Sequence, residues 1–200
     1  MHPNQAFRWE DRAGMRDLVA GVGFGSLFAN TPDGPRVAHV PAVWDRDDRL
    51  IVHLARGNAL TRHLHGATAL FSAIGPDGYV SPDWYGLDHN QVPTWNYVAV
   101  ELEGMVEKLD EAGLIAQIDA LVAAQEARLA PKPAWTRDKM DSKAFAAMLR
   151  GITGFALTIQ AWRGTVKLGQ NKPEAARLAA ADGLAAAGRP AIAELMRRIP

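Results

Sequence analysis

The sequence of 200 residues contains no cysteine. Disulfide bonds, thiolate metal sites and cysteine nucleophiles are therefore excluded. Charge of one sign is not in excess either, because Lys+Arg and Asp+Glu number 22 each. Without a net charge, the chain has no overall field that would draw it to a polyphosphate or to an anionic membrane surface. This balance makes DNA binding doubtful.

Long hydrophobic runs are missing as well. No apolar stretch approaches the roughly 20 residues that span a bilayer, and residues 1–11 lack the basic-then-apolar order of a secretory signal. We therefore expect a soluble, cytoplasmic protein without membrane contact. The chain also lacks the Gly-x-Ser-x-Gly elbow of hydrolases and the glycine-rich loops that bind dinucleotides and nucleoside triphosphates.

What the sequence does contain is a series of β-forming runs separated by turn residues. Hydrophobic residues make up 48% of the chain, which suits one domain with a substantial core. Six or seven strands are predicted, and the long strand 92–109 is expected to bulge near Gly104. The strands are expected over 24–30, 37–44, 50–55, 67–74, 92–109 and 152–162, with turns at 76–78 and 163–164, each followed by a short extended segment.

Apolar residues at helical spacing predict helices set between and after these strands. They are expected over 9–22, 58–65, 110–130, 141–149, 173–187 and 191–198, with Asp110 as one N-cap. Early hairpin spacing with helices in the connections favours a mainly β (α+β) fold, a closed or partly closed antiparallel barrel with peripheral helices. An open α+β sandwich is the alternative.

The first candidate site is a strand end that carries a cation. In the segment 53–58, Arg56 is followed by Gly57 and Asn58 before a short helix. The forked donors of Arg56, the Asn58 amide and free N–H groups at the helix start would suit a phosphate. A surface arginine beside an asparagine N-cap is the alternative, and from spacing alone it is the commoner case.

Two further segments have the composition of a ligand pocket. Segments 81–85 and 93–97 together hold two Trp and two Tyr, which suit the walls of a site for a flat conjugated ligand but equally a barrel end or a dimer interface. Lys167, Gln170 and Asn171 follow the last strand. A lysine with two amides suits the carbonyls and ring nitrogens of a heterocycle, although a polar strand end is commoner.

The six histidines do not form a metal motif. His63 and His65 lie two apart in a predicted helix and so point to different faces, and no carboxylate set completes a zinc shell. His39 and His53 belong to neighbouring strands and could line one pocket. Histidines satisfied within a sheet are the alternative.

The ordered series of these segments resembles the PaiB-like family of FMN-binding negative transcriptional regulators. The resemblance rests on His39-Val40-Pro41, on 53–58, on 78–85, on 92–100 with its tract Pro93–Tyr97, and on 167–171, and it covers about residues 1–178. The chain departs from the family pattern at His2, where tyrosine is frequent, at Gly169, where serine is frequent, and at Leu60, where many relatives have a phosphate-binding lysine.

The resemblance implies an FMN-binding split β-barrel that is a homodimer and holds FMN between its subunits. Residues 1–171 would form this domain, with a helical extension over 172–200 packed on it. The segment Leu50–Asn58 would hold the FMN phosphate, with Arg56 in place of the missing lysine. The cofactor-binding residues implied are His39, His53, Leu54, Arg56, Asn58, Trp95, Asn96, Lys167, Gln170 and Asn171.

Two functions follow from this expectation. The first is a flavin-binding regulator that acts through a partner or a small-molecule effector, since the balanced charge and the absence of a helix-turn-helix pattern give no basis for reading DNA. The second is an FMN-dependent oxidoreductase acting on a small-molecule substrate. In both cases we expect Trp95 and the segment 167–171 to share one pocket at the flavin ring, because the ends of antiparallel strands meet at one rim of a barrel.

Overall fold

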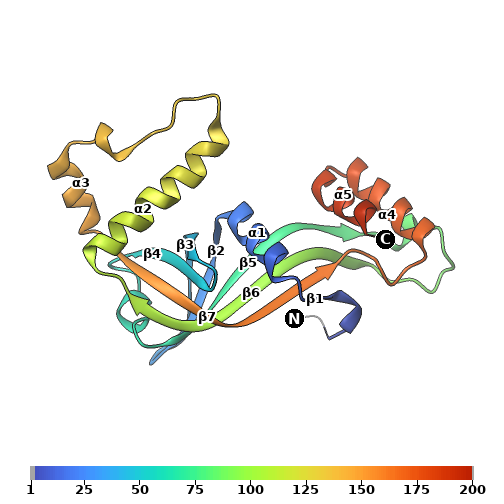
Figure 1. Ribbon diagram of the computed structural model, residues 1–200. Helices are drawn as coiled ribbons and strands as arrows, with labels where there is room; N and C mark the ends of the chain where they lie inside the picture. Colours follow the sequence, from blue (N-terminus) through green and yellow to red (C-terminus); the bar gives the residue numbers. More distant parts are fainter. Residues whose placement is uncertain (1–2, 200) are drawn as a thin grey trace. The chain divides into compact units, whose positions relative to one another are not determined.

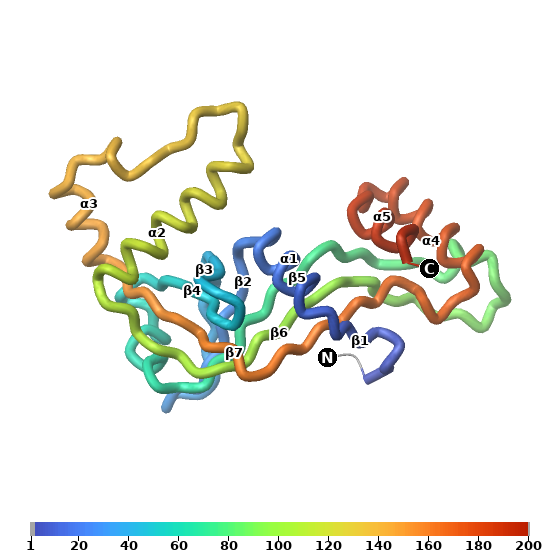
Figure 2. The backbone as a smooth tube through the Cα atoms, viewed as in Figure 1, coloured from blue at the N-terminus to red at the C-terminus, as the bar shows by residue number. Residues whose placement is uncertain are grey.

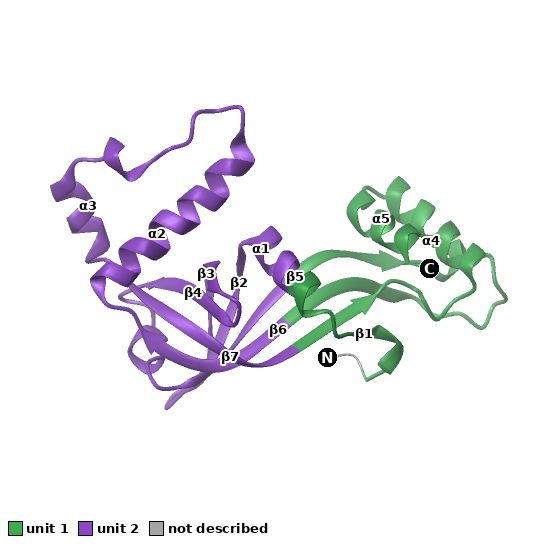
Figure 3. Ribbon diagram, viewed as in Figure 1, with its two compact units in different colours: residues 1–15, 74–100, 163–200 green, residues 16–73, 101–162 purple. Residues whose placement is uncertain are grey.

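The computed structural model describes residues 3–199 (Figure 1). The chain divides into two compact units, shown in Figure 3. Unit 1 contains residues 1–15, 74–100 and 163–200, and unit 2 contains residues 16–73 and 101–162. The prediction for His2 lies outside the described residues. The division into 1–171 and 172–200 stays a prediction.

Six long strands form a closed ring, the main part of which lies in unit 2. Neighbours in the ring follow the order β7-β4-β3-β2-β5-β6, and β6 pairs again with β7. The registers of β2 with β3 and β5, and of β4 with β3 and β7, are antiparallel. The expected antiparallel barrel is thus confirmed in place of the open sandwich. The strands are β2 (Phe24–Thr31), β3 (Gly34–Arg46), β4 (Arg49–Ala55), β5 (Thr68–Val80), β6 (Thr94–Lys108) and β7 (Ile152–Lys167).

Alternating side chains fill the interior of this barrel. Every second residue is buried over 96–106 of β6 and over 69–73 of β5, as a half-exposed strand requires. In β4 and β7 consecutive residues are buried, because α2 (Glu111–Glu126) packs against β3 and β4 from outside. The largest fully buried side chains of unit 2 are Leu27, Leu50, Leu60, Leu64, Phe71, Leu102, Phe155 and Leu157.

Between β6 and β7 the chain leaves the barrel as two helices joined by a proline-containing loop (Figure 2). The predicted cap is confirmed, since Asp110 accepts a hydrogen bond of 2.7 Å from the backbone N–H of Gly113 at the start of α2. Asp141 caps α3 (Ser142–Leu149) in the same way, accepting from Lys143 and Ala144. Earlier in the chain, α1 (Arg12–Val22) precedes β2.

The C-terminal helices belong to unit 1. Helices α4 (Glu174–Ala186) and α5 (Pro190–Arg198) pack on each other, and Leu184, Ile192 and Met196 are fully buried there. The short strand β1 (Arg8–Trp9) pairs with β7 and was not predicted. The 3-10 turns are η1 (Gln5–Phe7), η2 (Thr61–His63), η3 (Pro82–Tyr85), η4 (Ala127–Leu129) and η5 (Arg137–Lys139). No helix in the described part of the chain is long and apolar enough to span a membrane.

Two predicted turns are wrong. Each contains a glycine that is required for close packing and not for a turn. The strands β5 and β7 continue through 76–78 and 163–164, and neither Gly78 nor Gly164 has a positive φ. A Cβ on Gly78 would lie 2.6 Å from Leu184, and one on Gly164 would lie 2.9 Å from the backbone of Trp9. These glycines permit a helix and a strand to approach closely. The one or two helical turns predicted over 58–65 are present as the 3-10 turn η2.

Candidate functional site

The strand end at Arg56 forms a locally fixed turn. After β4 ends, the backbone N–H of Asn58 donates to the Ala55 carbonyl at 2.9 Å. The Asn58 side-chain oxygen accepts from the N–H of Leu60 at 2.9 Å, and the Thr61 hydroxyl donates to the same Ala55 carbonyl. Leu60 is fully buried, so it anchors the turn to the core. The turn therefore holds the backbone of Arg56 in place while its side chain remains exposed.

A basic pocket of about 380 Å³ borders this turn. Arg56 lines this pocket together with Lys108, at the end of β6, and Arg150, at the end of α3. Within residues 3–199, no hydrogen bond or ion pair engages the charged groups of these three side chains. Asp110 and Glu111 also line the pocket, but the Asp110 carboxylate is occupied as the α2 cap. Three cations against two carboxylates leave the lining with a net positive charge.

His53 and Leu54 precede the turn on opposite faces of β4. Leu54 is buried in the barrel. The His53 Nδ1 lies 3.0 Å from the side-chain oxygen of Gln117 on α2. Gln117 is 1% exposed, and its amide nitrogen has no partner among the described residues. Burial lowers the pKa of His53, and the hydrogen bond to Gln117 opposes that shift. Because the side-chain oxygen of Gln117 can only accept, His53 donates from Nδ1, and burial favours the neutral form of its ring.

His39 lies elsewhere, on the outer face of the barrel. Its Nδ1 is 3.1 Å from the hydroxyl of Ser26, its partner residue across the β2–β3 pair. Successive side chains of a strand point to opposite faces. The exposed His39 therefore lies on the face that also carries Phe28 and Val37, one pair further along the same two strands.

In unit 1, strand β6 directs its candidate residues to two different faces. Trp95 is half exposed, donates to Asp77 at 2.9 Å and meets the Tyr79 ring edge-on at 6.0 Å. Asn96 points the other way and is 1% exposed. Its amide nitrogen lies 3.4 Å from the Met196 sulfur, and its side-chain oxygen has no partner in the described part of the chain.

The segment 167–171 contacts the Asn96 side of β6. Lys167 donates to the Thr94 hydroxyl and lies 5.8 Å from the Phe7 ring centre, and burial lowers its pKa. Gln170 accepts from Leu168 and donates to the Ala6 and Val166 carbonyls. Asn171 is exposed. Since Thr94 and Trp95 face opposite ways, β6 separates Trp95 from Lys167 within one chain, and a shared flavin pocket stays a prediction.

Comparison with protein-family models gives one decisive match. The model described as "Putative FMN-binding domain" matches residues 1–161 of the chain. The chain belongs to this FMN-binding family. The match contains β1 to most of β7, and thus every strand of the barrel and the Arg56 turn. FMN is accordingly the cofactor of this member of the family, as predicted.

Relatives of known name and structure agree with this membership. The "Protease synthase and sporulation protein PAI 2" of Bacillus subtilis is 28% identical over 162 residues, covering 79% of this chain and 76% of the relative. The expected resemblance to the PaiB-like family is thereby confirmed. Among solved structures, an FAD and heme binding protein from Mycobacterium smegmatis superposes with a TM-score of 0.58 at 21% identity, over 80% of this chain and 73% of that one.

A second solved structure shares the same fold. The flavocytochrome Anf3 from Azotobacter vinelandii has a TM-score of 0.58 at 18% identity, over 84% of this chain and 72% of that one. At this identity the likeness concerns the fold alone. It agrees with the split-barrel prediction and with the strand ring described above.

The basic pocket fits the phosphate group of FMN. An open turn is needed for a phosphate to approach, and a Cβ added to Gly57 would meet no atom within 4 Å. Unpaired guanidinium groups are the preferred partners of phosphate oxygens, because their forked donors match them in geometry and charge. Arg56 supplies such a group at the edge of this turn.

Lys108, Arg150 and Gln117 were missed by sequence reasoning. Each lies at least forty residues along the chain from the β4 turn, at the end of another strand or on an inserted helix. The pairing of β4 with β7 brings Arg150 to the turn, because Ala55 pairs with Ile152. The closure of the barrel between β6 and β7 brings Lys108 there, and the packing of α2 brings Gln117 to β4. The one signal in the sequence was positional, since Lys108 and Arg150 stand at opposite ends of the excursion between two strands. Of the described residues, no three His, Asp or Glu side chains gather as a metal site would require.

The His53–Gln117 pair predicts a pH dependence of stability. A histidine whose pKa is lowered in the folded state from the ordinary 6.5 is protonated first in the unfolded chain. Unfolding therefore takes up a proton as the pH falls through that range, and the free energy of unfolding decreases. We expect a lower urea midpoint at about pH 5.5 than at about pH 7.5, and a smaller difference in His53→Gln. The exposed His89→Gln is the control, and an equal pH response in His53→Gln would contradict the assignment.

Proposed function

We propose that the protein is a cytoplasmic, homodimeric FMN-binding regulator in which the basic pocket at Arg56 holds the FMN phosphate. One observation carries the proposal, namely that a member of an FMN-binding family assembles three unpaired cations beside an open turn. The phosphate would accept from Arg56, Arg150 and Lys108. FMN, when bound, supplies a ring that can accept a hydride or electrons.

The remaining predicted residues are proposed to shape the site around this anchor. Burial lowers the pKa of His53, and the hydrogen bond to Gln117 orients its ring, so that the neutral imidazole offers Nε2 as an acceptor in a fixed orientation. Leu54 and Asn58 hold the strand end and the turn. The proposed flavin contacts also include His39, Trp95, Asn96, Lys167, Gln170 and Asn171, and those that belong to unit 1 would contact the flavin held by the second subunit.

The visible spectrum of the purified protein tests cofactor binding directly. We expect a yellow protein with flavin absorption that denaturation releases as FMN. A protein that is colourless and does not take up added FMN would contradict the proposal. Released FAD in place of FMN would also contradict it, because the second phosphate and the adenosine need contacts that the proposal does not provide.

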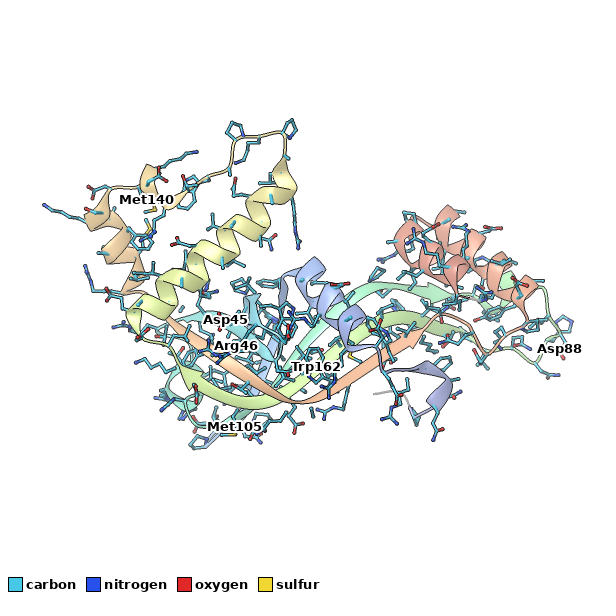
Figure 4. All side chains as sticks on the ribbon, in the orientation of Figure 1. Asp45, Arg46, Asp88, Met105, Met140 and Trp162 are labelled. Atoms are coloured by element: carbon cyan, nitrogen blue, oxygen red, sulfur yellow. The ribbon has the colours of Figure 1, made fainter. Side chains whose placement is uncertain are left out.

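The homodimer is supported by an apolar face on three neighbouring strands of unit 2. Phe24, Phe28 and Val37 are 52%, 39% and 44% exposed. Phe28 pairs with Val37 on one side and with Leu70 on the other. Met105 of β6, labelled in Figure 4, is a further exposed apolar side chain of the barrel. Exposed apolar side chains gathered on neighbouring strands mark an interaction site, and a second copy of the chain is the proposed occupant.

A charge placed in this face should dissociate the dimer. Phe28→Asp would put a carboxylate among apolar partners, and we expect the dimer to weaken by roughly tenfold or more. Sedimentation of the wild type should give about twice the chain mass of 21.7 kDa, and the variant should shift toward the monomer. The exposed Leu129→Asp on η4 is the matched control. A wild type that remains monomeric at micromolar concentration with FMN bound would contradict the proposal.

A regulatory output is proposed from the relative whose name refers to protease synthase and sporulation. The balanced charge of the chain favours regulation through a partner or a small molecule over direct reading of DNA. Salt-sensitive and sequence-dependent retention of DNA by the purified protein would contradict that route.

An FMN-dependent oxidoreductase is the second candidate, and Lys167 favours it. This lysine is held by Thr94 and Phe7 in partly buried surroundings that lower its pKa, which is a property of groups that bind or protonate substrates. NADH-dependent bleaching of the flavin that is slowed in Lys167→Ala would support the enzyme. If neither NADH nor NADPH bleaches the flavin, the oxidoreductase is contradicted and the regulator remains the proposed function.

A further inference from the structure

A second pocket lies between α2, the loop 130–141 and α3, and it shares no lining residue with the basic pocket. Its volume is about 670 Å³, within the range of small-molecule sites. Figure 4 shows Met140, one of its residues, on the loop beside α3. The lining residues are Asp119, Val122, Ala123, Ala127, Ala134, Trp135, Thr136, Arg137, Asp138, Met140, Ser142 and Phe145.

Specific contacts hold the loop in the shape that forms this pocket. The Glu126 carboxylate accepts from the backbone N–H of Trp135 at 2.8 Å and from Lys132. Lys139 donates to the Ala134 carbonyl at 2.9 Å. At the other end, Asp141 fixes the start of α3. The pocket is therefore preformed, so the loop loses less conformational entropy when a ligand binds.

The walls of the pocket suit a flat apolar body. Trp135, Met140 and Phe145 are each half-buried, so they present apolar surface to solvent within a concave site. Val122 and two alanines of α2 complete the apolar part. An aromatic ligand would bury this surface and stack on the two rings.

The charges of the lining are not balanced. The Arg137 guanidinium donates to the Asp119 carboxylate at 3.1 Å. It also lies over the Phe145 ring, whose centre is 5.1 Å from the guanidinium carbon. Asp138 has no ion-pair partner within residues 3–199, and a hydrogen bond from the Thr136 side chain lowers its pKa. The charge of Lys139, which does not line the pocket, lowers the Asp138 pKa further, and the lining itself holds two carboxylates and one cation.

We propose that this α2–α3 pocket binds a small aromatic molecule that carries one positive charge. The ring would lie between Trp135 and Phe145, and the cation would face Asp138. A cation beside aromatic faces gains attraction from the rings as well as from the carboxylate. An anionic ligand would instead be repelled by the Asp138 carboxylate. The proposal is independent of the FMN proposal, because none of its residues lines the basic pocket.

Three indoles with a cationic, a neutral and an anionic side chain test the proposal on the full-length protein with its flavin bound. Calorimetric titration with tryptamine, indole-3-ethanol and indole-3-acetate compares a cation, a neutral compound and an anion. We expect tryptamine to bind most tightly and indole-3-acetate most weakly. Asp138→Asn should weaken tryptamine roughly two- to fivefold and leave indole-3-ethanol unchanged.

Aromatic variants locate the binding. Trp135→Ala should weaken the binding of all three indoles by roughly two- to tenfold. Phe145→Leu provides a second variant, which removes the ring but keeps an apolar side chain at this position of α3. Met148→Ala, which changes an exposed apolar residue of α3 outside the pocket, is the matched control. The proposal is overturned if the anion binds as tightly as the cation, if no indole binds at millimolar concentration, or if Trp135→Ala and Phe145→Leu bind like the wild type.

Discussion

Arg56→Ala should weaken FMN binding about ten- to a hundredfold and leave riboflavin binding nearly unchanged. Removing one charge-assisted hydrogen bond typically costs about 1.5–3 kcal/mol, and each 1.4 kcal/mol is about a factor of ten. Riboflavin lacks the phosphate, so it has no contact to lose. The guanidinium of Arg56 has no partner among the described residues, so its removal breaks no internal contact.

The comparison of the two ligands separates this role from a general effect on the fold. Fluorescence titration of apoprotein with FMN and with riboflavin gives both affinities for each variant. Arg150→Ala, in the same pocket, should likewise weaken FMN binding more than riboflavin binding. Arg36→Ala, at the hairpin end of β3, should change neither affinity. Equal losses for FMN and riboflavin in Arg56→Ala would show that Arg56 acts on the pocket shape and not on the phosphate.

Gly104→Ala should destabilise the whole barrel by about 3 kcal/mol. A Cβ at this position would lie 1.9 Å from the Thr158 carbonyl oxygen and 3.0 Å from the Ile159 Cα. Both atoms belong to the backbone of β7, which cannot rotate away as a flexible side chain can. The pairing of β6 with β7 closes the ring, so relief of the clash would open the barrel.

Urea unfolding followed by circular dichroism measures this effect. Gly21→Ala is the matched control, because a Cβ at Gly21 in α1 meets no atom within 4 Å and should stabilise the helix slightly. A Gly104→Ala variant whose free energy of unfolding lies within about 0.5 kcal/mol of the wild type would contradict the close approach of the two strands.

The elements that could be predicted from the sequence are those defined by local patterns. Helix α2 begins after Asp110, and β2 and β3 are joined at Gly34, whose φ of 96° suits only glycine well. Such signals are contained in a few consecutive residues. The turns predicted at 76–78 and 163–164 failed for the opposite reason, because Gly78 and Gly164 are required by Leu184 and Trp9, which lie far away in the sequence.

The candidate site shows the same division. The Arg56 turn was predicted because its cation, glycine and asparagine are consecutive, whereas Lys108 and Arg150 complete the pocket from other strand and helix ends. Gln117 was not predicted, because a glutamine in an amphipathic helix gives no sign of which strand it will face.

By itself the sequence determined the order of strands and helices, the absence of thiol chemistry and of net charge, and membership of an FMN-binding family. Only the tertiary structure decided which glycines permit segments to pack closely, that Lys167 contacts Thr94 while Trp95 contacts Asp77, and which cations gather at Arg56. The physical reason is that hydrogen-bond caps and turns act between near neighbours in the chain, while side-chain surroundings depend on which strands pair when the barrel closes.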